Sequence, residues 1–244
     1  PEIFRHVAAF LTSGAGLALL DAEEGGGKSF LLDLACGTAG VVQRVVLSPF
    51  HVNLPWSAIA PLADVFGFCD GSALREEFGP MAPLFAPFLG GALLPDTQES
   101  KALDPQARTQ WLQTQFVERM QTRAFSWAVD GAQWMDPLSA ETVRLWKRGE
   151  SGTGRVLLAL RDGALWQEMA QIGWRLEPWV GGQIQALLER DPPAERLDPH
   201  AGDVLAQLTG GNALRIISLL RLAAQRELWR YDPALDHTVL REAE

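Results

Sequence analysis

Residues 15–35, AGLALLDAEEGGGKSFLLDLA, decide the fold of this chain. The run at 15–20 is short, continuous and apolar, which is typical of a strand buried on both faces of a parallel sheet. Three glycines follow, and the next segment places apolar residues at the spacing of a helix packed on a sheet. These residues are Phe30, Leu31, Leu34 and Ala35. The stretch therefore predicts a strand, a glycine-rich loop and a helix in direct succession.

The loop between this strand and helix has the chemistry of a phosphate site. The unpaired N–H groups and the positive dipole end of the helix point beyond the carboxyl end of the strand. Gly25, Gly26 and Gly27 let further backbone N–H groups converge on phosphate oxygens without Cβ collisions. We predict that Lys28 reaches the β and γ phosphates of a nucleotide and that the Ser29 hydroxyl ligates Mg²⁺. The residues predicted to bind the nucleotide are Ala22, Glu23, Gly25, Gly26, Gly27, Lys28, Ser29 and Phe30.

Two features of the loop depart from the P-loop pattern G-x-x-x-x-G-K-[ST]. Ala22 stands where that pattern has its first glycine. Alanine costs little there if the φ of residue 22 is negative, and it strains the loop by ~1 kcal/mol or more if that φ is positive. Glu24 places a negative charge beside the anion site, which weakens phosphate binding unless its side chain turns outward to water. The alternative to a phosphate loop is a glycine-rich helix entry with a chance Lys-Ser.

Further apolar segments predict the remaining strands of a sheet, at 41–48, 125–129, 155–160 and 174–179. Helical patterns separate them, and after Pro178 the sequence shows helical periodicity only. This alternation predicts an α/β fold, a three-layer αβα P-loop NTPase with a mainly parallel five-stranded sheet, followed by a small all-helical lid domain. The predicted domains are 1–176, for nucleotide binding, with a helical insertion at about 54–123; 177–228, the lid; and 229–244, a linker or the start of a further module.

The third predicted strand ends at Asp130, about a hundred residues after the loop. In P-loop NTPases such a strand lies beside the strand of the loop, and its terminal Asp binds Mg²⁺ through water. An acidic residue usually follows and orients the attacking water, but position 131 is glycine here. The sequence therefore predicts a Mg²⁺ site made by Ser29 and Asp130, without the acid that activates water at Gly131.

Composition and charge restrict the classes of function. The net charge of −9 and the scattered positions of the 21 Lys and Arg residues argue against direct nucleic-acid binding by this segment. Cys36 and Cys69 lack close Cys or His neighbours, so we expect reduced thiols and no zinc site. The histidines show no ligand spacing, and His51, after the second strand, is the one that could approach a nucleotide. No leader and no apolar run of the ~20 residues that span a membrane are visible, so we predict a cytoplasmic protein.

Five segments together resemble the nucleotide-binding domain of the STAND class of AAA+ ATPases. This class occurs in large bacterial regulators with a LuxR-type or other effector module and in proteins linked to adenylyl cyclases. The segments are ALLDAEEGGGKSFLLDLA (18–35), LPWSAIAPLADVFG (54–67), FSWAVDGAQWMDPLSAETVRLW (125–146), VLLALRD (156–162) and LTGGNALRIISLLRLAAQREL (208–228). The combination Gln133-Trp134-x-Asp136-Pro137 is the most specific, because general strand-to-helix chemistry does not call for it.

The resemblance implies a nucleotide-dependent conformational switch in signal transduction or transcriptional regulation. ATP or ADP with Mg²⁺ would bind between the sheet domain and the lid, and a protein partner or further domains would receive the change. Arg161 would lie near the γ-phosphate as a sensor, and Lys28, Asp130 and Arg161 are the catalytic candidates. A strand-end arginine paired with Asp162 is the alternative role for Arg161.

Three departures from the family pattern fall on the nucleotide site. Ala22 replaces the loop glycine, Gly131 replaces the second acid, and Ala213 stands where the lid of the family has a proline. An acid that orients water contributes about 10²-fold to 10⁴-fold to the rate. Hydrolysis is therefore predicted to be slow or absent unless Glu23, Glu24 or Asp136 substitutes, and a slow ATPase is the candidate activity. The alternatives are a degenerate fold that acts as a non-catalytic interaction scaffold, and a small-molecule kinase.

Overall fold

The structure is a computed structural model and describes residues 2–40, 42–89, 94–149, 152–161, 163–189, 198, 200–226, 229–232 and 237–240. The chain divides into two compact units. One comprises residues 1–21 and 29–174, and the other comprises 22–28 and 175–244. The glycine-rich loop thus groups with the C-terminal segment of the chain, whereas the strand before it and nearly all of the helix after it belong to the first unit. The predicted domain boundaries stay a prediction.

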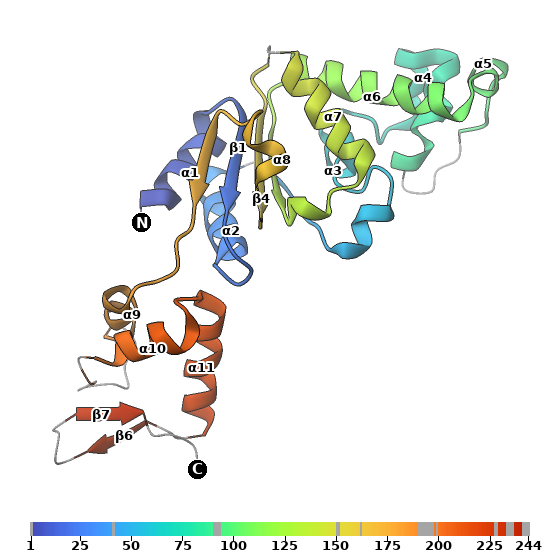
Figure 1. Ribbon diagram of the computed structural model, residues 1–244. Coiled ribbons are helices and arrows are strands. Elements are labelled where there is room, and N and C mark those ends of the chain that lie inside the picture. The colour runs from blue at the N-terminus through green and yellow to red at the C-terminus, as the bar shows by residue number, and fades with distance from the viewer. Residues whose placement is uncertain are drawn as a thin grey trace. The chain divides into compact units, whose positions relative to one another are not determined.

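A five-stranded sheet with the strand order β2-β3-β4-β1-β5 forms the centre of the first unit (Figure 1). The strands are β1 (Gly16–Asp21), β2 (Gln43–Val46), β3 (Ser126–Asp130), β4 (Arg155–Leu160) and β5 (Ile172–Arg175). The β1–β4, β3–β4 and β2–β3 pairs are parallel, and the arrow of β5 runs in the same direction as that of β1. The predicted α/β class with a parallel five-stranded sheet is confirmed. β2 is shorter than the predicted segment 41–48, and β5 covers 172–175 where 174–179 was predicted.

The strand order corrects one sequence-based expectation. β3 does not lie beside β1, because β4 pairs with both of them. Asp130 of β3 and Leu20 of β1 lie opposite the same residue, Ala159 of β4. Two steps of the usual spacing between strands put the ends of β1 and β3 about 10 Å apart. Both strands nevertheless end at the same edge of the sheet and at the same level, with Arg161 directly after the strand between them.

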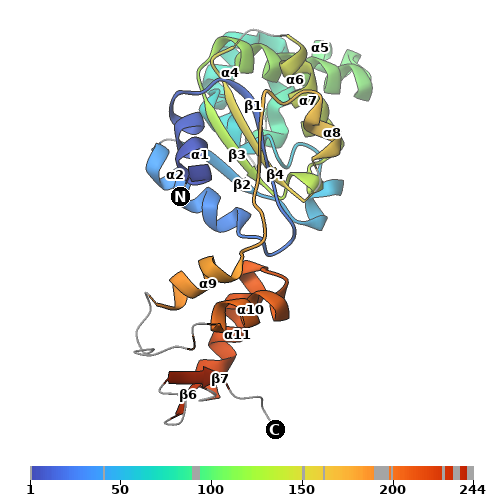
Figure 2. The same ribbon diagram turned by 60° about the vertical axis from the view of Figure 1, so that its left-hand side comes forward.

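Helices cover both faces of the sheet, which gives the predicted three layers (Figures 1 and 2). On one side lie α1 (Glu2–Ser13) and α2 (Lys28–Ala39), and on the other lie α3 (Ala60–Val65), α6 (Pro105–Thr122) and α7 (Pro137–Arg148). The remaining helices of this unit are η1 (Pro49–Asn53), α4 (Gly71–Phe78), η2 (Gly79–Phe88), α5 (Gln98–Ala102), η3 (Ala132–Trp134) and α8 (Ala164–Gln167). Asp104 and Asp136 cap α6 and α7 as their Asp-Pro sequences indicate, by accepting from the N–H groups of Ala107 and Ser139.

The buried face of α2 differs from the predicted one. Leu32 and Ala35 are buried against the unit, whereas Phe30 is 74% exposed and Leu34 is 49% exposed. Apolar residues occupy positions 30, 31, 32 and 34, so the sequence permits more than one stripe at helical spacing. The prediction that Phe30 and Leu34 pack on the sheet is therefore wrong.

The helical insertion contributes an aromatic core. Trp56 stacks on Phe116 with ring centroids 5.9 Å apart, and Phe66 meets Phe125, next to β3, edge to face at 5.5 Å. Trp127 of β3 is fully buried in the same cluster. Offset and edge-to-face aromatic pairs stabilise a core beyond the area that they bury. The insertion is thus part of the main core of this unit.

The second unit has a small core of its own. Three helices, α9 (Gly181–Leu188), α10 (Ala201–Thr209) and α11 (Ala213–Gln225), pack around Ile184, Leu188, Leu205 and Ile216. Beyond them, β6 (Trp229–Asp232) and β7 (His237–Leu240) pair as an antiparallel hairpin, which helical periodicity did not predict. Across both units, the described residues include no helix with the length and apolar character needed to cross a membrane.

Candidate functional site

The loop at 22–28 depends on its glycines. Gly25 and Gly27 have φ values of 76° and 93°, in the left-handed region that favours glycine. A Cβ on Gly25 would lie 2.6 Å from Oδ1 of Asn212, so a side chain there also lacks space. Within the loop, the N–H of Gly26 donates to the carbonyl of Glu23 at 3.1 Å. These features give a tight curl directly before α2.

Lys28 turns back over this curl. Its Nζ donates to the carbonyl oxygens of Ala22, at 2.6 Å, and Glu23, at 2.8 Å. The ammonium group is therefore held at the loop and adds its charge to the positive end of the α2 dipole. Backbone N–H groups in the first turn of α2 have no carbonyl partner within the helix. An ammonium group beside the amides that begin a helix is a combination common in phosphate sites.

The loop accommodates Ala22 and Glu24, the two residues that depart from the P-loop pattern. Among the described non-glycine residues only Trp56 has a positive φ, so Ala22 is not in the left-handed region. Ala22 is also buried, and its methyl group lies 3.1 Å from the place that a Cβ on Gly26 would take. Glu23 and Glu24 are exposed, so water screens the charges of both carboxylates. The missing glycine therefore brings no backbone strain to the loop.

The start of α11 holds the loop from within the same unit. Nδ2 of Asn212 donates to the carbonyl of Glu24 at 2.7 Å, and the backbone N–H of Leu214 donates to the carbonyl of Gly25 at 3.0 Å. Oδ1 of Asn212 meanwhile caps α11 by accepting from the N–H of Arg215. Sequence reasoning did not assign Asn212 and Leu214 to the site. The only available signal was an Asn at a helix cap in the segment 208–228.

Asp130, the predicted Mg²⁺ ligand, already has a cation beside it. The residue is 6% exposed, and its Oδ2 lies 3.2 Å from Nη2 of Arg44 on β2. Nη1 of the same guanidinium pairs with Asp33 of α2. Arg44 was missed by sequence reasoning, although an arginine inside a short β-branched strand is a signal in itself. The carboxylate fits a metal site by its chemistry and position, but one of its oxygens faces an arginine.

The other predicted site residues, Arg161, Ser29 and Phe30, are all exposed. Arg161 is exposed and follows β4 immediately, so it stands at the edge of the sheet where β3 ends. Its alternative partner, Asp162, lies outside the described residues. Ser29 and Phe30 are exposed in the first turn of α2. The described residues contain no group of three or more His, Cys, Asp or Glu side chains placed to hold a metal ion.

The backbone itself requires glycine at position 131. Gly131 has a φ of 77°, and a Cβ there would lie 2.6 Å from the carbonyl oxygen of Leu47. The N–H of Gly131 donates to the carbonyl of Ala159 at 3.0 Å, which holds this turn against β4. An acidic side chain at 131 therefore requires the turn to rearrange.

Asp136 does not supply the missing acid. It is 1% exposed, and its carboxylate accepts from the N–H groups of Trp56 and Ser139, each at 3.0 Å, and from the Ser57 hydroxyl at 3.2 Å. His51 is also held locally, because its Nδ1 lies 2.9 Å from the Ser48 hydroxyl. The Asp-Pro motif is thus a structural clamp, and the carboxylate is already fully engaged.

Comparisons with known proteins find similarity to solved structures only, at low sequence identity. No protein-family profile and no curated protein matches it. Similar solved structures include a signal transduction ATPase with numerous domains, with a tetratricopeptide repeat sensor, from Pyrococcus horikoshii, which is 12% identical with a TM-score of 0.49. That match covers 87% of this chain but 28% of the other, so this chain spans less than a third of that protein. A Walker-type ATPase of Pyrococcus abyssi is 17% identical with a TM-score of 0.40, covering 93% of this chain and 73% of the other. Because both sequence identities and both TM-scores are low, we argue the function of the site from the residues of this chain alone.

Proposed function

We propose that this chain is a nucleotide-binding domain that binds ATP or ADP with Mg²⁺ and acts as a conformational switch. One observation carries the proposal: a loop with the chemistry of a phosphate site is hydrogen-bonded through the carbonyls of Glu24 and Gly25 to the start of α11. The same short segment can therefore bind an anion and transmit the result to a helix.

The binding step is supported by the charges at the loop. The Lys28 ammonium and the first-turn amides of α2 offer positive potential and N–H donors at one curl. Ser29 and Asp130 would hold the Mg²⁺, which, when bound, neutralises phosphate charge. Ser29 is exposed, and Asp130 is the last residue of β3, which ends at the same edge of the sheet as β1. Arg161, after β4, is the proposed sensor of the terminal phosphate.

The switching step is supported by the two hydrogen bonds to α11. A phosphate bound by the loop amides reorients the peptide planes at residues 24 and 25. The carbonyl groups of these planes accept the hydrogen bonds from Asn212 and Leu214. If α11 has one state with these hydrogen bonds and one without them, the nucleotide interacts with the two states with different energies. Such a difference is what a ligand needs to shift the populations of two states. The change would pass to further domains or to a protein partner in a bacterial signalling protein, in the cytoplasm where ATP is available.

Hydrolysis is proposed to be slow. Asp136 is engaged by four donors, and Gly131 has a left-handed backbone conformation in which an acidic side chain would require the turn to rearrange. Without an acid that orients water, the rate falls by about 10²-fold to 10⁴-fold. A domain of this kind would stay in one nucleotide state for long periods, as a switch requires.

Titration with a fluorescent ATP analogue, with and without Mg²⁺, tests the binding step. We expect saturable binding by the wild-type chain and its loss in Lys28→Ala, with Lys101→Ala as the matched control because Lys101 is an exposed lysine on α5. Equal binding by wild type and Lys28→Ala, or no binding by either, refutes the proposal. No binding by either protein supports the alternative of a non-catalytic scaffold, which the pairing of Asp130 with Arg44 favours.

Hydrogen exchange of residues 213–225 tests the switching step. We expect saturating nucleotide to change the exchange of α11 in the wild type. Asn212→Ser keeps a neutral helix cap but removes the amide that donates to Glu24, so binding should persist while the response of α11 is lost. Asn53→Ser, in η1, is the matched control and should respond like the wild type. An α11 response that survives in Asn212→Ser contradicts the proposed coupling.

A further inference from the structure

Arg44 is the residue of this region whose role the proposed function leaves open. It lies on the edge strand β2 opposite Ala128, two residues before the end of β3. From there its guanidinium bridges two carboxylates, Asp33 of α2 and Asp130 of β3. Asp130 is nearly buried, whereas Asp33 is exposed. The bridge thus joins the helix that follows the loop to the strand that carries the proposed metal ligand.

The position of the bridge places Arg44 beside the proposed Mg²⁺ site. Ser29 and Asp33 are separated by four positions on α2, so their side chains lie on one face of the helix, about 6 Å apart along its axis. Arg44 contacts Asp33 and Asp130, and Ser29 and Asp130 are the two proposed metal ligands. A guanidinium group therefore lies within about one helix turn of the place that a divalent cation would take.

The guanidinium is not fully satisfied in this position. Nε of Arg44 is buried and has no hydrogen-bond partner among the described residues. Buried polar atoms in proteins are nearly always hydrogen-bonded, so the unpaired Nε is an exception that a structural role for Arg44 does not explain. An arginine with a purely structural role would be expected to use its planar fork of donors completely.

We propose that Arg44 is a resident cation that neutralises Asp130 while the metal is absent, and that Mg²⁺ must displace it to bind. This inference rests on the proposed function, because it concerns the same metal position. Two cations cannot share one nearly buried carboxylate without strong repulsion. Arg44 therefore lowers the affinity of the free protein for divalent cations and makes metal binding depend on a nucleotide whose phosphates add negative charge. Arg44 is a positioning residue in this scheme, since it acts through Asp130.

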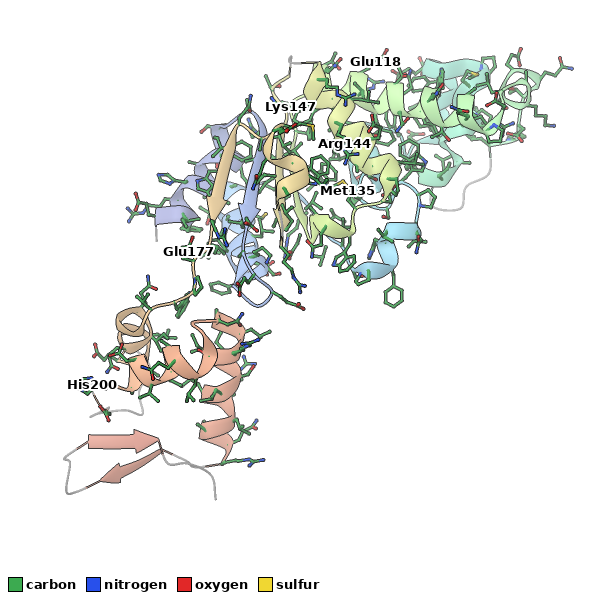
Figure 3. The ribbon with its side chains drawn as sticks, viewed as in Figure 1. Glu118, Met135, Arg144, Lys147, Glu177 and His200 are labelled. Atoms are coloured by element: carbon green, nitrogen blue, oxygen red, sulfur yellow. The ribbon has the colours of Figure 1, made fainter. Side chains whose placement is uncertain are left out.

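Binding of Mn²⁺, followed by electron paramagnetic resonance of the free ion, tests the inference on the nucleotide-free full chain. Arg44→Met keeps the length of the stem but removes the charge, and we expect it to bind Mn²⁺ about tenfold more tightly than the wild type, the effect of losing one charged hydrogen bond. Adding Asp130→Asn to Arg44→Met should abolish the gain. Arg144→Gln is the matched control for lost charge, because Arg144 lies on α7 (Figure 3), pairs with Glu141 and stacks over Trp166.

Unchanged or weaker Mn²⁺ binding by a folded Arg44→Met variant overturns the inference, as does a gain that survives Asp130→Asn. If Arg44→Met does not fold, the Nε–H signal of Arg44 in the ¹⁵N spectrum of the wild type decides. That signal should shift when Mg²⁺ is added to saturation, and an unchanged signal refutes displacement.

The two proposals fail in different ways. If the wild type binds the fluorescent ATP analogue and Arg44→Met shows no gain in Mn²⁺ binding, the resident-cation role fails and the proposed function stands. If no variant binds nucleotide while Arg44→Met gains a Mn²⁺ site that depends on Asp130, the proposed function fails, and the competition between Arg44 and the metal stands without its link to nucleotide.

Discussion

The carboxylate of Asp136 accepts a 3.0 Å hydrogen bond from the backbone N–H of Trp56, the only described non-glycine residue with a positive φ. The two residues are 80 positions apart in sequence. Asp136 also caps α7, so a single buried side chain fixes the segment after β3 and the start of the helical insertion. Left-handed backbone persists at a non-glycine residue only when its surroundings hold it there. Asp136 and the aromatic contacts of Trp56 provide that restraint.

The first prediction concerns this clamp. Asp136→Asn should lower the free energy of unfolding by about 2–3 kcal/mol, because an amide nitrogen would face buried donors that now meet a carboxylate oxygen. Urea denaturation measures the loss. Asp104→Asn is the matched control, since Asp104 caps α6 but is exposed, and it should cost about 1 kcal/mol or less. Equal losses in the two variants would show that burial of Asp136 contributes nothing.

The second prediction concerns the missing acid. Gly131→Glu should not create an ATPase, and it should lower stability by at least about 1–2 kcal/mol, because residue 131 is left-handed and faces the carbonyl of Leu47. Phosphate release and thermal unfolding measure the two effects. Gly37→Glu, at an open and exposed position of α2, should be tolerated. A rise in phosphate release in Gly131→Glu alone would reverse this interpretation.

The third prediction concerns the departure at position 22. Ala22→Gly restores the sequence pattern but should not raise nucleotide affinity, because Ala22 has no left-handed strain to relieve. The extra freedom of glycine in the unfolded chain should instead cost about 0.4–1 kcal/mol of stability. Titration with the fluorescent analogue and urea denaturation measure both quantities. A gain in affinity of tenfold or more would mean that the methyl group obstructs the site.

The fourth prediction concerns the contact between the loop and α11. Gly25→Ala should destabilise the chain by about 1 kcal/mol or more, because the added methyl group meets Asn212 and the φ of residue 25 is left-handed. Gly182→Ala provides the comparison, since this α9 residue has open space and should become more stable by about 0.5–1 kcal/mol. Thermal unfolding measures both changes, and similar shifts of the two variants would contradict the observed contact.

The fifth prediction concerns the pH dependence of thiol reactivity. Burial raises the pKa of Cys36, and the charge of Arg44 opposes this effect. The thiolate is the reactive form, so removing Arg44 should move the midpoint of the rate-versus-pH curve further up, and removing the negative charge of Asp33 should move it down. Alkylation rates of Arg44→Met and Asp33→Asn, in a Cys69→Ser background, measure these shifts. If the midpoints of both variants coincide with that of the Cys69→Ser parent, the charges of Arg44 and Asp33 do not affect the pKa of Cys36.

The sequence predicts much of the fold because the decisive signals are local. Continuous apolar runs identified the three central strands, and Asp-Pro pairs identified the starts of α6 and α7. The order of the strands was not predictable in this way, because β4 pairs not only with β3, the strand before it in the chain, but also with β1, which lies more than a hundred positions earlier in the sequence. The buried face of α2 was ambiguous for another reason, since apolar residues surround its first turn.

The candidate site was predictable to the extent that it lies in one segment. Gly-Lys-Ser and its flanking elements indicated Lys28 and the loop glycines directly. Arg44 and Asn212 entered the site only through folding, because each contacts a residue that is distant in the chain. The lack of space for a side chain at position 131 likewise comes from the carbonyl of Leu47, which no pattern in the neighbourhood of Gly131 reveals.

The hydrogen bond from Leu214 to Gly25 has a practical consequence for anyone who shortens this protein. A fragment that stops after β5 keeps every strand of the five-stranded sheet, yet it loses the N–H groups of Asn212 and Leu214 that donate to the carbonyls of residues 24 and 25. The smallest piece able to present the curl in its native form is therefore set by α11, and deletion series that end earlier will report on a loop that has lost its anchor.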